Sequence, residues 1–168
     1  MSQSSLSLDS SLHVRDARGR YRMATPEQIL AAARHAIDHQ IPRGAALSSP
    51  QTVRDFLRAK LAGLTYEMFS VLFLDNRHRL IEYVEMFRGT IDGASVHPRE
   101  VVKETLVRNA AAVILAHNHP SGVVDPSQAD ELITRRLRDA LALVDVRVLD
   151  HIIVAGNDTL SMAERGLI

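Results

Sequence analysis

The chain of 168 residues is 46% hydrophobic and carries twenty basic and twenty acidic residues. A chain of this length can bury one good core and has little left for a second domain. Its zero formal charge provides no basic surplus for neutralising a phosphate backbone, and its lack of cysteine excludes disulfides and thiolate zinc ligands. The composition indicates one globular domain without a strong bias towards nucleic acid.

The first residues predict an extension ahead of this domain. Residues 1–24 are rich in Ser, Asp and Arg, and we expect them to be poorly ordered or loosely docked. Thr25 as N-cap and Pro26 at the first helical position predict a helix that continues to about His39. The stretch 44–50 is typical of a linker. The predicted division is an N-terminal extension, residues 1–45, partly disordered with one helix, and a domain, residues 46–168.

Residues 1–13 do not contain the basic stretch followed by an apolar block that marks a secretory signal. The sequence also has no apolar run that approaches the roughly 20 residues needed to span a bilayer. We therefore expect a cytoplasmic protein with no membrane partner.

The centre of the chain alternates apolar runs of strand length with helical stripes. Ser49 and Pro50 predict the start of a helix that ends near Gly63. The turn residues Asn76 and Arg77 separate two apolar runs and indicate a hairpin, so the sheet is mixed. The order predicts an α/β fold with a mixed β-sheet flanked by helices. The predicted elements are strand 69–75, strand 79–88, helix 98–110, strand 112–117, helix 126–143, strand 146–154, and a turn with short edge structure after residue 157.

Three candidate metal ligands lie within fourteen residues of one another. His117 and His119 follow the buried-strand pattern 113–116, and side chains two residues apart on an extended strand point to one face. Asp125-Pro126-Ser127 offers an N-cap and a first-turn proline for a helix, which places Asp130 in its first turn, able to reach the histidines. An isolated pair of histidines is more often merely polar and exposed. Their place at a strand end favours a metal site with an open position for water.

The pattern H-x-H-P, with Ser127 and Asp130 eight and eleven residues after the second His, resembles the JAMM signature of the MPN (JAB) metallopeptidases. The resemblance runs from about Leu47 to Ile168 and implies a single MPN (JAB)-like domain with one Zn²⁺ at a strand end, held by His117, His119 and Asp130. Asn118 departs from the Ser or Thr that is usual in the better-studied JAMM peptidases. The segments most similar to the bacterial RadC branch are residues 87–92, 97–103 and 109–122.

The resemblance also implies two catalytic residues. Glu67 precedes the apolar run 71–74, as the JAMM base precedes a core strand, and a carboxylate near a metal-held water can take its proton. Composition alone would make Glu67 a solvated residue at a helix–strand junction. Ser127 corresponds to the serine whose hydroxyl helps to hold the reacting carbonyl oxygen, although it could equally be an ordinary residue of a first helical turn.

Asp150 and His151 lie in the middle of the last predicted long strand. A ligand histidine usually donates its free N–H to a second group, and this pair could supply such a group. A structural role for His151 is an equal alternative, and the sequence does not decide between the two.

The leading hypothesis is a zinc-dependent metallopeptidase or amide hydrolase that acts on a peptide or protein substrate. One alternative is a DNA-repair-associated accessory protein, as the naming of the RadC family implies. Its support is a short basic patch, Arg135, Arg136 and Arg138, which acidic residues surround. The other alternative is an MPN domain that binds a peptide without cleaving it. The oligomeric state is left open.

Overall fold

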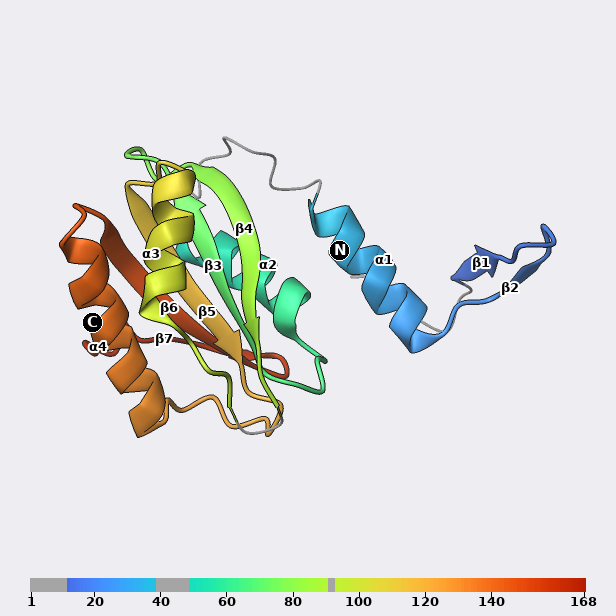
Figure 1. The fold of residues 1–168 in the computed structure, drawn as a ribbon. Helices are drawn as coiled ribbons and strands as arrows, with labels where there is room; N and C mark the ends of the chain where they lie inside the picture. The colour runs from blue at the N-terminus through green and yellow to red at the C-terminus, as the bar shows by residue number, and fades with distance from the viewer. Residues whose placement is uncertain (1–11, 39–48, 91–92) are drawn as a thin grey trace, which may run out of the picture. The chain divides into compact units, whose positions relative to one another are not determined.

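The computed structural model describes residues 12–38, 49–90 and 93–168, and the chain falls into two compact units, residues 1–40 and 41–168 (Figure 1). We describe each unit by itself. The boundary predicted at residues 45 and 46, most of the predicted linker 44–50 and the predicted helix end at His39 lie outside the described residues.

The first unit contains a small hairpin and a helix. Strand β1 (His13–Arg15) pairs antiparallel with strand β2 (Tyr21–Met23), and helix α1 (Pro26–Asp38) follows. The hairpin is a local structure that the sequence did not predict, while the expectation that residues 1–24 are poorly ordered or loosely docked stays a prediction. It closes because the Asp16 carboxylate accepts hydrogen bonds from two backbone N–H groups of the turn, and because Gly19 adopts a left-handed φ of 79°.

The second unit is built on a mixed five-stranded sheet in the order β4-β3-β5-β6-β7. Strands β5 and β6 are parallel, and the other neighbours are antiparallel. The predicted hairpin and the predicted mixed α/β sheet are confirmed. The strands are β3 (Met68–Leu74), β4 (Leu80–Arg88), β5 (Ala112–Asn118), β6 (Arg147–Ala155) and β7 (Asp158–Ser161).

Within the described residues, three helices cover the sheet. Helices α3 (Pro98–Val107) and α4 (Gln128–Ala142) lie on one face, and α2 (Pro50–Leu61) lies on the other (Figure 1). Strands β3 and β5 are buried along their whole length, so their apolar residues serve both faces. The core between the sheet and helices α3 and α4 contains Phe69, Val71, Phe73, Val101, Val113, Leu115, Leu137 and Leu141.

Two helix ends differ from the sequence prediction. Helix α3 ends at Val107 rather than at residue 110, because Asn109 adopts a left-handed φ of 51° and stops the helix. Helix α4 has Ser127 as its N-cap, so the expected N-cap and first-turn proline at residues 125 and 126 precede the helix. Ser127 is favoured because its side chain and that of Asp130 form a capping box.

The described part of the chain holds no helix with both the length and the apolar character needed to cross a membrane.

Candidate metal centre

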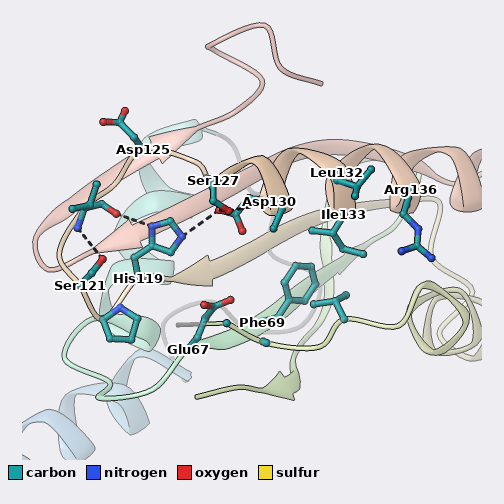
Figure 2. A pocket seen from close by; sticks show the side chains of 16 residues that line it. Glu67, Phe69, His119, Ser121, Asp125, Ser127, Asp130, Leu132, Ile133 and Arg136 are labelled. Atoms are coloured by element: carbon teal, nitrogen blue, oxygen red, sulfur yellow. Dashed lines mark hydrogen bonds and ion pairs between the residues drawn. The ribbon is translucent and has the colours of Figure 1, made fainter. Parts of the chain in front are cut away.

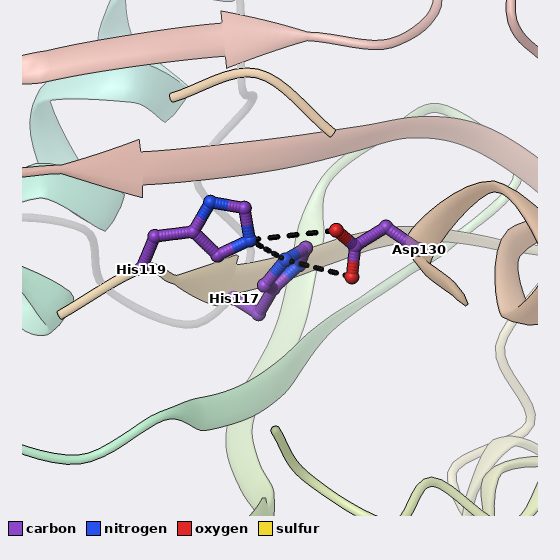
Figure 3. A group of neighbouring side chains, drawn as sticks. All are labelled: His117, His119 and Asp130. Carbon is purple, nitrogen blue, oxygen red and sulfur yellow. Dashed lines mark hydrogen bonds and ion pairs between the residues drawn. The ribbon is translucent and has the colours of Figure 1, made fainter. Parts of the chain in front are cut away.

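The structure brings the three predicted ligands together at the end of β5. His117 lies in β5, His119 follows it directly, and Asp130 extends from the first turn of α4 (Figure 3). The two histidine Nε2 atoms are 2.9 Å apart. The Oδ1 of Asp130 lies 3.2 Å from the Nε2 of His117, and the Oδ2 of Asp130 lies 3.4 Å from the Nε2 of His119. Within the described residues, this is the group of three His, Cys, Asp or Glu side chains that could hold a metal ion.

The spacing of these donor atoms is compatible with three corners of a zinc tetrahedron. Metal–ligand bonds of about 2.0–2.1 Å place the corners of a tetrahedron about 3.3 Å apart. The two histidine nitrogens are 2.9 Å apart, each lies 3.2 or 3.4 Å from a different oxygen of Asp130, and one ligand atom from each residue lies within 4.8 Å of the other two. Two imidazoles and one carboxylate also leave a fourth position open, so the residues fit a metal ion of this size.

Electrostatics also favours a cation between the three groups. The Nδ1 of His119 donates to the Val123 carbonyl over 2.6 Å, which leaves its Nε2 lone pair facing the centre. Burial opposes ionisation of Asp130, but His117 and His119 outweigh it, because their Nε2 atoms donate to the carboxylate when protonated, and they hold the pKa of that carboxyl well below its usual range. The same hydrogen bond from protonated His119 to Asp130 raises the pKa of His119. Bringing these groups together therefore creates a strong demand for a proton or a metal ion.

Glu67 lies immediately before β3 and lines the same pocket as His119 and Asp130 (Figure 2). It is half-buried, and this burial raises the pKa of its carboxyl, while the nearby imidazoles oppose the rise. The surroundings differ from those of a solvated residue at a helix–strand junction. A half-buried carboxylate close to the candidate metal centre is where a general base is needed.

The backbone around Glu67 is tied to the end of β4. Glu67 donates its N–H to the Thr90 carbonyl and accepts from the Gly89 N–H, both over 2.8 Å. A Cβ on Gly89 would lie 2.1 Å from the Gly93 carbonyl oxygen, so only glycine permits this close approach. The segment at Gly93 and Ala94 thereby packs beside Glu67 and forms part of the pocket wall.

Asn118 is a contributor that the sequence analysis recorded only as a departure from the usual signature. Its buried side chain accepts from the Met68 N–H over 2.8 Å and donates to the Tyr66 carbonyl over 2.9 Å. These bonds clamp the two neighbours of Glu67. The residue between the two histidines thus fixes the distance between the candidate ligands and the candidate base. Its position between them was the available signal, but its partner fifty residues away could not be read from the sequence.

Ser127 also lies in the pocket wall, where it contacts Asp130 rather than open space. Its Oγ donates to the Asp130 Oδ2 over 2.6 Å, and its backbone N–H donates to the same oxygen over 2.7 Å. In return, its Oγ accepts from the Asp130 N–H over 3.1 Å. These bonds orient the Asp130 carboxylate. The expected contact of Ser127 with a reacting carbonyl stays a prediction.

His119, Asp130, Glu67 and Ser127 line a cavity of about 640 Å³, whereas the third candidate ligand, His117, is buried. Figure 2 shows Phe69, Leu132 and Ile133 along the cavity, with Arg136 at a distance from Glu67 and His119. The cavity therefore combines a polar end that could hold a metal ion with an apolar wall that could hold a side chain.

The structure separates the roles of Asp150 and His151. His151 is fully buried, and its Nε2 lies 2.8 Å from the Nδ1 of His117. Asp150 turns the other way and accepts from the Ser161 hydroxyl and the Ala163 N–H. His151 therefore contacts a candidate ligand, whereas Asp150 attaches the C-terminal segment to β6.

The fold and this centre together define a JAB-type domain with a candidate metal centre at the end of a central strand. A family model described as RadC-like JAB domain matches residues 47–167, and the chain belongs to that family.

Similar proteins share the name UPF0758 protein. The one from Nitrosococcus oceani is 62% identical over 139 residues, which are 83% of this chain and 62% of that protein. The one from Cellvibrio japonicus is 59% identical over 140 residues, which are 83% of this chain and 62% of that protein. The one from Vibrio cholerae is 56% identical over 143 residues, which are 85% of this chain and 90% of that protein. The chain thus spans 62% of the length of the first two relatives.

Proposed function

We propose that this protein is a zinc-dependent hydrolase of the JAMM type that cleaves a peptide or isopeptide bond. The observation that carries the proposal is the convergence of the candidate ligands His117, His119 and Asp130, the last two of which line one cavity with Glu67. Membership of the RadC-like JAB domain family supports the same reaction class. The relatives' shared name specifies no reaction, so the activity rests on the site.

The residues divide the chemistry in the following way. Zinc held by the three ligands would act as a Lewis acid and lower the pKa of a water molecule bound in its open position. Glu67 receives the proton of the attacking water and delivers it to the leaving nitrogen. Its raised pKa suits both steps, because a carboxylate that is too acidic would hold the proton too weakly to deliver it.

Two residues maintain this arrangement. Asn118 holds the backbone on both sides of Glu67, so the base stays at a fixed distance from the ligands. Ser127 orients Asp130, and we assign it a second role in which its hydroxyl donates to the developing oxyanion. That second role requires the hydroxyl to turn from Asp130 to the substrate during the reaction.

The DNA-associated alternative has weaker support from the charged residues. Arg135 pairs with Glu131 at 3.3 Å, and Arg138 pairs with Asp139 at 3.4 Å. Arginines paired with neighbouring carboxylates in this way are typical of a solvated helix face. The non-catalytic peptide-binding alternative uses the same cavity and is separated by experiment.

The test is unbiased cleavage profiling of the zinc-loaded protein with linear peptides and with branched isopeptides. The matched control is Glu67→Gln, which keeps the size of the side chain and removes the base. We expect cleavage by the unaltered protein and a loss of about 10²–10⁴-fold in Glu67→Gln at unchanged zinc content. If the unaltered protein and Glu67→Gln both bind peptide and neither cleaves it, the result would support the non-catalytic alternative. Equal cleavage by the two proteins would contradict the role of Glu67.

A further inference from the structure

A continuous line of hydrogen bonds runs behind the candidate metal centre and returns to one of its own ligands. The Nδ1 of His117 lies 2.8 Å from the Nε2 of His151. The Nδ1 of His151 lies 2.6 Å from the Thr134 hydroxyl. That hydroxyl lies 2.5 Å from the backbone carbonyl of Asp130, whose side chain is the third candidate ligand.

The donor and the acceptor of each hydrogen bond in this line follow from its last acceptor, the Asp130 carbonyl. A carbonyl oxygen cannot donate, so the hydroxyl of Thr134 must donate to the Asp130 carbonyl. The same hydroxyl has one proton, so it accepts from the Nδ1–H of His151. His151 carries a proton on one nitrogen when neutral, so its Nε2 accepts from the Nδ1–H of His117. The lone pair of the His117 Nε2 then faces His119 and Asp130.

We propose that His151, oriented by Thr134, is a positioning residue that fixes the tautomer and ring orientation of His117 for metal binding. The inference rests on the metal-binding part of the proposed function and is independent of hydrolysis. A metal ligand needs an unprotonated Nε2, and the hydrogen bond at Nδ1 supplies that condition.

The fold holds His151 in the orientation that this role requires. It is fully buried in β6, and its ring makes an edge contact with the ring of Phe69, with the two ring centroids 5.6 Å apart. Parallel pairing of β6 with β5 places it opposite Leu115, two residues before His117. Thr134 is supplied by α4, one helical turn after Asp130, and is also buried. Strands β3 and β5 and helix α4 therefore meet at this one imidazole of β6.

The chemical consequence concerns charge. Ligand histidines commonly donate to a carboxylate or a carbonyl, whereas here the acceptor is a neutral imidazole. The acceptor supports His117 without adding a negative charge beside the ion. The Asp130 carboxylate is then the one anionic group among the three candidate ligands, so a divalent cation there keeps a net positive charge to polarise a bound group.

The first test measures zinc affinity of the full chain by competition with a chromophoric chelator at fixed pH. His151→Leu removes the acceptor, and we expect the affinity to fall about 10–100-fold. His151→Gln keeps an acceptor near the position of Nε2, so it should recover most of that loss. Unchanged affinity in His151→Leu, or an equal loss in both variants, would overturn the proposal.

A matched pair tests the second member of the line. Thr134→Val keeps the shape and removes the hydroxyl, so it should weaken zinc binding in the same direction as His151→Leu. Met162→Leu is the control, because the buried Met162 sulfur is only a weak second acceptor for the same hydroxyl, at 3.7 Å, and does not contact His151 through this line. Equal effects of these two substitutions would indicate packing rather than proton placement.

A measurement on the unaltered protein remains decisive even where a variant fails to fold. Long-range ¹H–¹⁵N spectra of the histidine rings in the zinc-loaded chain report which nitrogen carries the proton. We expect His151 with a proton on Nδ1 and a bare Nε2, and His117 with a proton on Nδ1 and a metal-bound Nε2. A proton on the Nε2 of His151 would contradict the proposal, whether or not the protein hydrolyses any substrate.

Discussion

Zinc removal should lower the melting temperature of the domain by a predictable amount. The three candidate ligands come from the end of β5 and the start of α4, so an ion bound by them joins two elements that unfolding separates. At a free zinc concentration about 1,000 times the dissociation constant, binding to the folded state stabilises it by about 4.1 kcal/mol. An unfolding entropy of about 2.1 cal/mol/K per residue converts this energy into about 15 °C for a unit of about 130 residues.

The assay is differential scanning calorimetry of the full chain with zinc buffered at that concentration and with excess chelator. The transition of residues 41–168 should move by about this amount, while His117→Ala should melt at the same temperature in both conditions. Equal melting temperatures of the unaltered protein with zinc and with chelator would refute the reasoning. A full zinc-dependent shift in His117→Ala would show that zinc binds through other residues.

Further predictions concern the support of the site and its pH dependence. Gly89→Ala should lower turnover at unchanged zinc content, because its Cβ collides with the Gly93 carbonyl beside the proposed base. The control is Gly93→Ala, whose Cβ meets no atom within 4 Å and which should behave as the unaltered protein. Equal turnover in the two variants would contradict this prediction. Asn118→Ala leaves a buried Met68 N–H without its acceptor and should cost about 1–3 kcal/mol in chemical denaturation, and an unchanged midpoint would contradict the clamp. Ser127→Ala should reduce turnover about 10²–10³-fold if its hydroxyl donates to the oxyanion, with an unchanged rate assigning the residue to helix capping alone. The raised pKa of His119 in the metal-free protein makes protons compete with zinc, so affinity measured by chelator competition should fall about tenfold per pH unit below that pKa and flatten above it.

The raised pKa of His119 predicts that the stabilities of the chelated protein and of the zinc-bound protein respond to pH in opposite directions. A histidine whose pKa is raised by folding stabilises the protein below its unfolded pKa, and this contribution is lost as pH rises through the folded value. The chelated protein should therefore lose this contribution as pH rises, whereas zinc stabilisation should increase over the same range because fewer protons compete. Melting curves recorded at several pH values with chelator and with zinc test the difference, and a parallel response of both forms would contradict it.

The fold was largely predictable because its strands and helices carry clear local signals. The buried runs of β3 and β5, the turn at Asn76 and Arg77, and the amphipathic stripes of the helices each identify one element. The ends were harder to place. At the start of α4, residues 125–127 offer two possible helix starts, one with Pro126 at the first helical position and one with Ser127 as the N-cap. The reciprocal hydrogen bonds of Ser127 and Asp130 select the second.

The candidate ligands were predictable because they are close in sequence, whereas their supporting residues were not. His151 was recognised as a candidate partner, but its contact with His117 depends on the parallel register of β5 and β6. Asn118 contacts backbone groups about fifty residues earlier, which requires β3 to lie beside β5. Such pairings follow from sheet register, which a single sequence does not specify.

The most direct test of the central claim is diffraction from crystals of the zinc-loaded full chain at the zinc absorption edge. The account predicts one anomalous peak about 2.0–2.2 Å from the Nε2 atoms of His117 and His119 and from a carboxylate oxygen of Asp130. Glu67 should face the open coordination position without binding the metal. A peak that lacks any of the three ligands, or one that Glu67 ligates directly, would contradict the account.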